Sequence, residues 1–349
     1  MTGQKLIDWY EVNKRHLPWR DIENPYLIWV SEIILQQTRV IQGIEYYRRF
    51  VEAYPDIFSL AEANVDDVLK IWQGLGYYSR ARNMYAAAQH IIHVCQGKFP
   101  TDYQGLIAIK GIGDYTASAI ASLAFGQAVP VIDGNVNRVI ARLYGIRQPV
   151  NTATGQKEIR AYAEKMMLRH DPGTYNQAIM EFGALQCVPK NPDCDVCILK
   201  QVCVAFRIGL VGVLPVKLKT VKMSTRYFHY LHVKVGEQTF IRQRSEGDIW
   251  TGLYEFPLIE TAAETGLDEL SRSPVWQSYF VGQTPFVERI SREITHRLTH
   301  RILKIRFYEI AVDRLISGSD LIEISTKELR RYAVPVIIDQ YLNKKREYF

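Results

Sequence analysis

LIAIKGIGDYTASAI, residues 106–120, predicts a short helix, a tight turn at Gly111-Ile112-Gly113, and a second helix. Two glycines around a hydrophobic residue let the turn close and let backbone N–H groups face outward. The N-terminus of the second helix adds a partial positive charge, so the turn can form a nest for a phosphate group. A plain helical hairpin is the other interpretation. We expect Asp114 to point away from the nest, because a carboxylate would repel phosphate.

A single aspartate, Asp133, follows 20 residues after Gly113, within the segment VIDGNVNR at residues 131–138. A carboxylate between a hydrophobic segment and a helix makes a good helix N-cap. It could equally be a catalytic group, and this segment alone does not separate the two interpretations.

Four cysteines lie further along the chain with the spacing C-x6-C-x2-C-x5-C, and four thiolates this close can surround one metal centre. The spacing is not the paired C-x2-C arrangement usual for tetrahedral zinc, and an iron–sulfur cluster held by four thiolates fits better. Structural zinc and two disulfides are the alternatives. Cys95 stands alone and is expected to be an ordinary buried thiol. The four candidate ligands are Cys187, Cys194, Cys197 and Cys203.

The composition narrows the class of protein. A length of 349 residues predicts two or three domains, and a net charge of +6 with many tyrosines and tryptophans hints at a nucleic-acid partner. No run of about 18 apolar residues occurs, so no membrane contact is expected. The charged segment from Lys5 to Arg20 has no apolar core, so no signal peptide is expected either. Clustered free cysteines favour a reducing compartment, and we expect a cytoplasmic protein.

Periodicity divides the chain in two. Residues 1–206 read as helical, whereas alternation from residue 226 predicts a separate α+β domain over 223–349. The apolar and basic segment 207–222 contains a proline and reads as a linker. The predicted helices include 60–72, 81–94, 116–125, 135–144 and 175–185, and the predicted strands include 227–235, 239–242 and 301–310.

The combination of this hairpin, the following aspartate and the four cysteines resembles the endonuclease III superfamily of DNA glycosylases, with the hairpin as a helix-hairpin-helix element. The resemblance implies an all-α fold with a six-helix barrel module at about 20–128 and an iron–sulfur module from 1–19 and 129–206. It also implies a 4Fe-4S cluster on the four cysteines. Bifunctional members carry a lysine two residues after the second turn glycine. Here Tyr115 stands at that position and Lys110 does not match it, so the amine nucleophile is missing.

Three further motifs closely resemble the signature of adenine DNA glycosylases, and this resemblance covers residues 5–206. They are LPWR at 17–20, WVSEIILQQTRV at 29–40 and GLGYYSRA at 74–81. Glu32 lies in the second motif. It could be a helix-start glutamate favoured by the helix dipole, but beside the other motifs a functional role is the better interpretation.

The resemblance implies a monomeric base excision repair enzyme that removes adenine mispaired with 8-oxoguanine or guanine in double-stranded DNA, in a bacterial cytoplasm and associated with the nucleoid. A purine leaves deoxyribose poorly until a ring nitrogen is protonated, and a buried carboxylic acid with a raised pKa can supply that proton. Glu32 is the candidate acid, aimed at N7, and an ionised Asp133 would stabilise the oxocarbenium-like state. Tyr115 and Asn135 would support this pair by hydrogen bonding.

The same resemblance implies a set of DNA-binding residues around a flipped base. Gln37 and Tyr77 match the intercalating residues, with Gln36, Thr38 and Leu75 beside them. The adenine pocket is expected to include Trp19, Arg20 and Gln177, and the phosphate nest Gly111 and Gly113. Arg39, Arg80, Lys110, Arg138 and Lys190 could bind phosphates or could simply form a solvated basic face.

The C-terminal domain resembles a Nudix (MutT-like) fold through FIRQR at 240–244 and WTGLYEFP at 250–257. The glutamate-rich Nudix box does not follow Pro257, so pyrophosphate hydrolysis is not expected. In adenine glycosylases this domain reads the base opposite adenine with a Phe-Ser-His loop. Its best match is Leu298-Thr299-His300, which keeps the hydroxyl and the histidine but not the aromatic ring, and Ile294-Thr295-His296 is a competing register.

Two other functions remain open at this stage. One is a bifunctional glycosylase/lyase of the endonuclease III kind, which Tyr115 and the extra domain disfavour. The other is a non-catalytic iron–sulfur protein that binds DNA, which would make Glu32 and Asp133 incidental. The sequence predicts no particular protein partner.

Overall fold

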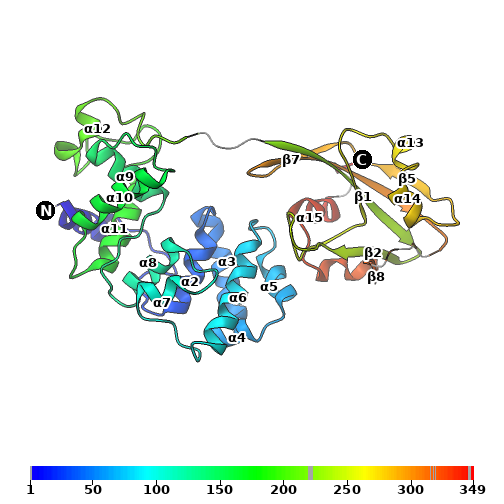
Figure 1. Cartoon of the computed structure of the whole chain (residues 1–349), viewed down its shortest axis with the longest axis horizontal. Coiled ribbons are helices and arrows are strands. Elements are labelled where there is room, and N and C mark those ends of the chain that lie inside the picture. Colours follow the sequence, from blue (N-terminus) through cyan, green and yellow to red (C-terminus); the bar gives the residue numbers. More distant parts are fainter. Residues whose placement is uncertain (1, 219–222, 315, 317, 319, 345–346) are drawn as a thin grey trace. The chain divides into compact units, whose positions relative to one another are not determined.

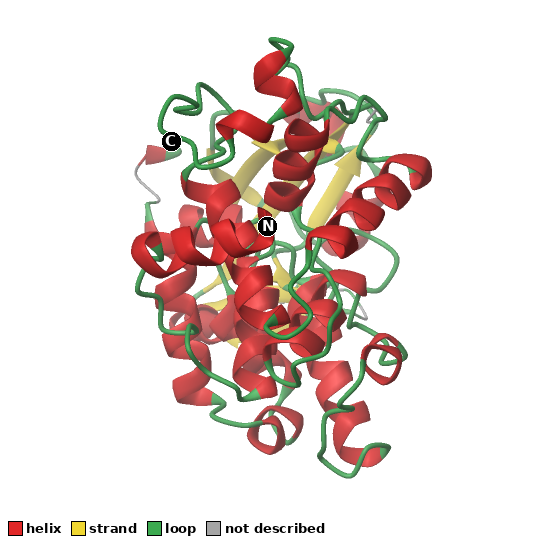
Figure 2. Ribbon diagram, turned by 90° about the vertical axis from the view of Figure 1, so that its left-hand side faces the viewer, coloured by secondary structure: helices red, strands yellow, loops and turns green. Residues whose placement is uncertain are grey.

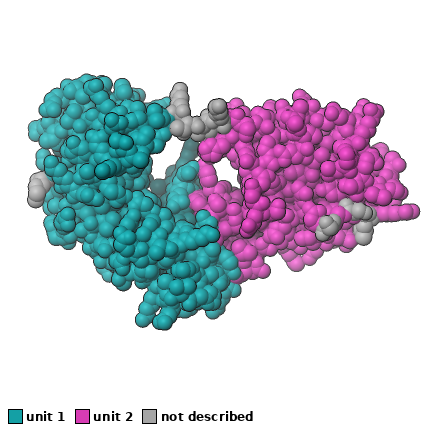
Figure 3. Space-filling view, in the orientation of Figure 1, with its two compact units in different colours: residues 1–62, 83–219 teal, residues 63–82, 220–349 magenta. Residues whose placement is uncertain are grey.

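The computed structural model describes residues 2–218, 223–314, 316, 318, 320–344 and 347–349. It divides into two compact units, which Figure 3 shows in different colours. We call residues 1–62 and 83–219 the helical unit, and residues 63–82 and 220–349 the sheet unit. Helices make up the first, and the strands all belong to the second (Figures 1 and 2). No helix in the described part of the chain is long and apolar enough to cross a membrane.

Polar residues define where many of the helices begin. Asn24 accepts hydrogen bonds from the N–H groups of Tyr26 and Leu27, and Asp56, Asn64, Asp102, Thr152 and Asp171 cap in the same way. Each such cap is worth about 1 kcal/mol. The helices are α1 Thr2–Asn13, α2 Pro25–Leu35, α3 Val40–Ala53, α4 Ile57–Ala61, α5 Val65–Trp72, α6 Ser79–His93, α7 Tyr103–Ile107, α8 Asp114–Leu123, α9 Gly134–Tyr144, α10 Ala153–Met166, α11 Pro172–Leu185 and α12 Val204–Arg207, with a 3-10 turn at Lys200–Val202.

The prediction of one helix over residues 60–72 is wrong. Helix α4 ends at Ala61, and α5 begins at Val65 because the Asn64 side chain accepts a hydrogen bond of 2.8 Å from the N–H of Asp66. Asparagine favours helix N-caps over helix interiors, so a new helix starts there although the apolar spacing continues. The other four predicted helices match α6, α8, α9 and α11 within three residues.

The core of the helical unit joins α1, α9 and α11, which are distant in sequence. Leu6, Ile140 and Phe182 are almost completely buried within it. Gly183 on α11 allows the close approach, because a Cβ at this position would lie 2.7 Å from the Cβ of Asn135. The start of α9 is thereby fixed against α11, on the side where the candidate site lies.

The segment predicted as a linker lies against the helical unit as far as it is described. The Arg142 side chain donates to the carbonyl of Leu214 at 3.0 Å, and Leu214 is buried. The N–H of Val150 donates to the carbonyl of Val216, also at 3.0 Å. The last four residues of the predicted linker, 219–222, lie outside the described residues.

The sheet unit is built on a long parallel pair, β1 with β7, and the other pairings are antiparallel. The order is β3-β2-β1-β7-β5, with β4 on β1, β6 on β7 and β8 on β2. All three strands predicted from the alternation are confirmed. The strands are β1 Ser224–Val235, β2 Gln238–Gln243, β3 Tyr254–Glu255, β4 Leu258–Thr261, β5 Phe286–Ile290, β6 Ile294–Arg297, β7 Arg301–Ala311 and β8 Ile322–Ser325.

Alternation along β1 supplies two apolar cores, one on each face of the sheet. Phe228 and Tyr230 pack with α15 (Val336–Asn343), whereas Leu231 and Val233 pack with α14 (Pro274–Tyr279). The remaining helical turns of this unit are α13 Leu267–Leu270 and a 3-10 helix at Thr326–Arg331.

Segment 63–82 belongs to the sheet unit although the sequence around it is helical. Lys70 donates to the carbonyl of Tyr332 at 2.9 Å, and the Tyr254 hydroxyl donates to Asp66 at 2.8 Å. These contacts fix α5 to the rest of the sheet unit. In the GLGYY segment that follows, the Tyr78 hydroxyl donates to the carbonyl of Val334 at 3.4 Å.

Candidate active site

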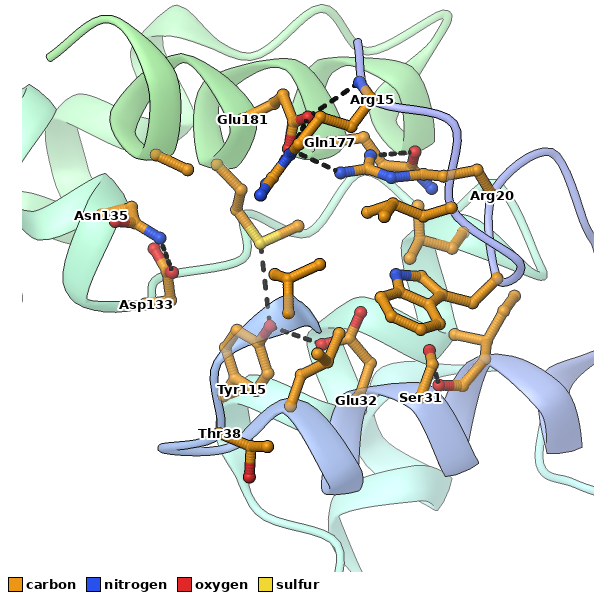
Figure 4. Close-up of a pocket in the computed structure, with 18 residues that line it drawn as sticks. Arg15, Arg20, Ser31, Glu32, Thr38, Tyr115, Asp133, Asn135, Gln177 and Glu181 are labelled. Atoms are coloured by element: carbon orange, nitrogen blue, oxygen red, sulfur yellow. Dashed lines mark hydrogen bonds and ion pairs between the residues drawn. The ribbon is translucent and has the colours of Figure 1, made fainter. Parts of the chain in front are cut away.

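A cavity of about 220 Å³ in the helical unit brings together most of the predicted chemistry (Figure 4). Its walls come from α2, α8, α9 and α11 and from the segment between α1 and α2. It is lined by eight residues singled out from the sequence, namely Trp19, Arg20, Glu32, Thr38, Tyr115, Asp133, Asn135 and Gln177.

Glu32 lies well inside α2, seven residues after Pro25, so it is not a glutamate of the first helical turn that the helix dipole would stabilise. Its neighbours on this helix are buried and, apart from Ser31, apolar, and Glu32 itself is only 7% exposed. The Tyr115 hydroxyl donates a hydrogen bond to Oε2 of Glu32 (Figure 4). Burial raises the pKa of Glu32 despite this bond and the charge of Arg20, and the nearby Asp133 raises it further. The carboxyl group is therefore biased toward its protonated form.

Asp133 is both the N-cap of α9 and a wall of the cavity, so the two interpretations of this residue are compatible. Its Oδ1 accepts from the N–H of Val136 at 2.7 Å, and its Oδ2 accepts from the Asn135 side chain at 2.8 Å. Burial raises the pKa of Asp133, whereas these N–H donors and the charge of Arg138 oppose that rise. Val136 and Asn135 both donate to the carboxylate, so they stabilise its ionised form.

Arg138 corrects one prediction, because it does not present its charge to solvent. It is buried, and its guanidinium donates to Asn135 Oδ1 at 2.8 Å, to the carbonyl of Gly183 at 2.7 Å and to the carbonyl of Cys187 at 2.7 Å. It orients the amide of Asn135 and connects the start of α9 to the first cysteine. In contrast, Arg39, Lys110 and Lys190 are exposed.

The opposite wall carries a network of charged and polar groups, in which the sequence analysis identified Arg20 and Gln177 but missed Glu181, Arg15 and Tyr10. Glu181 is almost fully buried and accepts two bonds of 2.7 Å from Arg15 and one of 3.0 Å from Arg20. Burial alone would raise the pKa of Glu181, but the hydrogen bonds from Arg15 and the charge of Arg20 outweigh it and lower the pKa. Arg20 and the Tyr10 hydroxyl both donate to Oε1 of Gln177.

A spacing in the sequence could have revealed part of this network. Gln177 and Glu181 are four residues apart. Together with Asn176 they are the only polar side chains in the otherwise apolar segment 176–185. Residues four apart share one helix face, so the pair predicts a polar patch facing a cavity. Arg15 and Tyr10 gave no comparable signal.

The other predicted residues around this cavity differ in exposure. Trp19 is buried and packs edge-on against Tyr47, with ring centroids 5.3 Å apart. Gln36 donates to the hydroxyl of Thr116 at 3.4 Å. Gln37 is exposed and has a φ of 56°, which is uncommon for a residue other than glycine. Such a strained, exposed tip is suited to a contact with a ligand.

The hairpin turn depends on one of its two glycines more than on the other. Gly111 has a φ of 103°, and a Cβ there would lie 2.8 Å from the carbonyl oxygen of Asn83. Gly113 is the N-cap of α8 and has open space where a Cβ would be. Asp114 accepts from the Tyr103 hydroxyl and from Arg160, each at 2.6 Å. Its charge is therefore paired and less able to repel a phosphate.

The four cysteines line a common small cavity, and none is in a disulfide. Two of the sulfurs accept N–H donors at 3.4 Å, Cys187 from Arg142 and Cys197 from the backbone of Leu199. Among the described residues, no three Cys, His, Asp or Glu side chains lie close enough together to hold one metal ion. A set of four sulfurs around one space, with N–H groups directed at them, suits a larger multi-iron group.

The predicted lesion-reading residues lie in the sheet unit, around a second cavity of about 420 Å³. Leu298-Thr299-His300 forms the turn between β6 and β7, whereas the competing register 294–296 is paired strand. Tyr77 has a φ of 48° and is 46% exposed, and its hydroxyl lies 2.9 Å from the Thr299 hydroxyl. Leu75 and Tyr77 line the cavity together with Leu298 and Thr299.

Comparisons with known proteins agree with both units. Residues 30–167 match the family model described as HhH-GPD superfamily base excision DNA repair protein, and residues 229–344 match a NUDIX domain. The solved structure of a thermostable thymine-DNA glycosylase is similar with a TM-score of 0.55 and 25% identity, over 59% of this chain and 95% of that one.

Two curated relatives extend over most of this chain. An adenine DNA glycosylase from Buchnera aphidicola (subspecies Schizaphis graminum) is 38% identical over 75% of this chain and 76% of that protein. One from Arabidopsis thaliana is 32% identical over 90% of this chain and 58% of that protein. The chain belongs to the adenine DNA glycosylase family of base excision repair enzymes, with a helix-hairpin-helix catalytic domain and a C-terminal NUDIX domain.

Proposed function

We propose that this enzyme hydrolyses the N-glycosidic bond of adenine mispaired with 8-oxoguanine or guanine in double-stranded DNA, with Glu32 as general acid and Asp133 as the stabilising carboxylate. The observation that carries the proposal is a pair of carboxyl groups, Glu32 buried and Asp133 partly buried, that share one cavity but have different partners. Burial raises the pKa of both groups, but Asp133 accepts two N–H donors that favour its ionised form, whereas Glu32 accepts the Tyr115 hydroxyl. Environments that differ in this way can hold one carboxyl group protonated, as the acid, and the other ionised.

The cavity would receive the adenine after it flips out of the duplex. The Tyr115 hydroxyl engages one oxygen of Glu32, which leaves the other to carry the proton to N7. As the glycosidic bond breaks, the electron pair leaves with the neutral base and positive charge develops on the sugar. Asp133 stabilises that charge, and water then completes the hydrolysis.

The lining of the cavity favours a hydrolase without strand cleavage. Burial keeps the pKa of Tyr115 well above its usual value, so this residue is a neutral donor. The cavity lining, all within the described residues, contains arginines but no lysine. No amine is therefore placed to attack the sugar.

The activity can be tested with duplexes that carry adenine opposite each of guanine, 8-oxoguanine, cytosine and thymine. Free adenine should be released from the first two, and strands should break only after alkali. Strand breaks without alkali would instead support a bifunctional lyase. Absence of base release from every duplex would support a DNA-binding protein without catalysis.

A 4Fe-4S cluster is proposed on Cys187, Cys194, Cys197 and Cys203, whose shared cavity and N–H···S contacts fit it. Burial and the neighbouring thiolates raise the pKa of Cys194 and of Cys203, so a cationic centre is needed to hold the thiolate forms together. The cluster would supply structural support to the segment that includes Lys190, and no redox step on the base.

The purified protein should be brown and should contain about four iron and four sulfide per chain. Cys194→Ser should lose the colour and most of the iron, whereas Cys95→Ser should keep both, because Cys95 lies apart from the four-cysteine cavity. Elemental analysis and visible absorbance give the answer. Zinc without iron or sulfide would rule out the cluster.

The sheet unit is proposed to read the base opposite adenine, through the turn 298–300. The turn presents the hydroxyl of Thr299 and the exposed side chain of His300. Tyr77, at its strained φ, is proposed to intercalate beside it. Base discrimination by hydrogen bonds is worth about 1–3 kcal/mol per good contact.

The double variant Thr299→Ala/His300→Ala should excise adenine opposite guanine but lose much of its preference for 8-oxoguanine. Point substitutions are the cleaner test, because removing residues 223–349 would strip segment 63–82 of its packing partners. The measurement is the ratio of single-turnover rates and affinities on the two duplexes. Full retention of the wild-type ratio would place lesion reading elsewhere, around Gln37, Thr38 and Leu75.

A further inference from the structure

Asp248 is the centre of an ion-pair cluster that the mechanism above does not use. Its Oδ1 accepts from Arg226 at 2.6 Å and from Arg301 at 2.7 Å. Its Oδ2 accepts from Arg226 at 2.7 Å and from Arg244 at 2.6 Å. Burial alone would raise the pKa of Asp248, but the hydrogen bonds from Arg226 and Arg301 outweigh it and hold the pKa far below its usual value. The carboxylate is therefore ionised, and each of its two oxygens accepts hydrogen bonds from two arginines.

This one carboxylate fixes two segments at once. Arg301 is the first residue of β7 and directly follows the turn 298–300, which closes with a bond of 2.8 Å from Leu298 N–H to the Arg301 carbonyl. Asp248 itself begins the loop 248–252, where its carbonyl accepts from the Thr251 hydroxyl at 2.9 Å. Arg244 also binds the Ile249 carbonyl at 2.8 Å. The cluster therefore ties the loop to the base of the turn.

The loop presents Trp250 to the same cavity that the turn lines. Trp250 has a φ of 59°, a conformation that costs of order 1–3 kcal/mol and persists only where surrounding contacts enforce it. Its ring centroid lies 5.9 Å from that of His296, and both side chains line the cavity with Tyr77 and Thr299. Burial lowers the pKa of His296, so it is a neutral ring at pH 7.

We propose that Asp248 is a positioning residue for discrimination of the base opposite adenine. It sets Trp250 in place as an aromatic wall against which a nucleotide of the lesion strand stacks. The inference rests on the proposed role of the turn 298–300 and extends it to the loop 248–252, whose residues 250–252 served in the sequence analysis only as part of a Nudix-like motif. Aromatic stacking on a base is worth about 1–3 kcal/mol, and hydrogen-bond readout needs donors held in place.

The test uses the full chain with Asp248→Asn. Asparagine has the same shape, but it loses the charge and turns an NH2 group toward arginine donors. The preference for 8-oxoguanine over guanine, as the ratio of single-turnover rates and affinities, should fall at least about fivefold. Asp248→Glu should recover part of it. Glu264→Gln breaks an ion pair of 2.7 Å with Arg306 in the same unit, away from the cavity lining, and should leave the ratio unchanged.

The outcomes separate the inference from the function on which it rests. If Thr299→Ala/His300→Ala loses the preference but Asp248→Asn retains it and only melts at a lower temperature, Asp248 is a structural residue and the inference is overturned. If the double-alanine variant itself keeps the preference, the proposed role of the turn 298–300 is contradicted, and with it the inference about Asp248. Should Asp248→Asn not fold, Trp250→Leu decides, since an unchanged ratio there also overturns the inference.

Discussion

Replacing Glu32 with glutamine should slow adenine excision by about 10²–10⁴-fold, the usual contribution of a general acid. Glutamine keeps the shape of the side chain and can still accept from Tyr115, but it has no proton of suitable acidity to give. Binding to the mismatched duplex should survive. Single-turnover excision and a separate affinity measurement distinguish the two effects.

The direction of the pH dependence follows from the raised pKa of Glu32. The protonated form is the active one, so the wild-type rate should fall as pH rises through this pKa. Glu45→Gln on the exposed face of α3 is a matched control and should behave as wild type. Rates for Glu32→Gln within a few-fold of wild type would exclude Glu32 as the acid.

Asp133→Asn should be similarly damaging, for a different reason. Asparagine is as good an N-cap as aspartate, so α9 should keep its start and the melting temperature should change little. The negative charge opposite the developing oxocarbenium ion is lost. Single-turnover excision measured beside thermal unfolding therefore separates catalysis from capping.

Asp171→Asn provides the matched control for this substitution. Asp171 caps α11 through the N–H of Thr174 but does not line the cavity that holds Glu32. It should show normal excision with equally small changes in stability. Normal excision by Asp133→Asn would reduce Asp133 to a helix cap.

Short-range patterns predicted much of this molecule. The alternation in β1 and the helical spacing of α6, α8, α9 and α11 follow from side-chain periodicity, which packing then reinforces. Asp133 was located because a cap leaves a local signature. Its neighbour Asn135 came from the same motif, through resemblance.

Contacts between distant segments could not be predicted in the same way. Tyr115 and Glu32 are 83 positions apart, and only the family resemblance paired them. From the sequence Arg138 was expected at the surface. In the structure its guanidinium donates to the carbonyls of Gly183 and Cys187, which lie 45 and 49 positions away, so no local pattern could indicate its burial. The attachment of Asp66 to Tyr254 spans 188 positions and leaves no periodic signal.

The central claim is that proton transfer from Glu32 to N7 drives loss of the base. The most direct test is single-turnover excision from a duplex with 7-deazaadenine opposite 8-oxoguanine, in which a carbon replaces N7. Glu32 then has no basic nitrogen at the proposed position. The account predicts that this duplex binds like the adenine duplex and is not cleaved. Excision at a rate near that of adenine would contradict it.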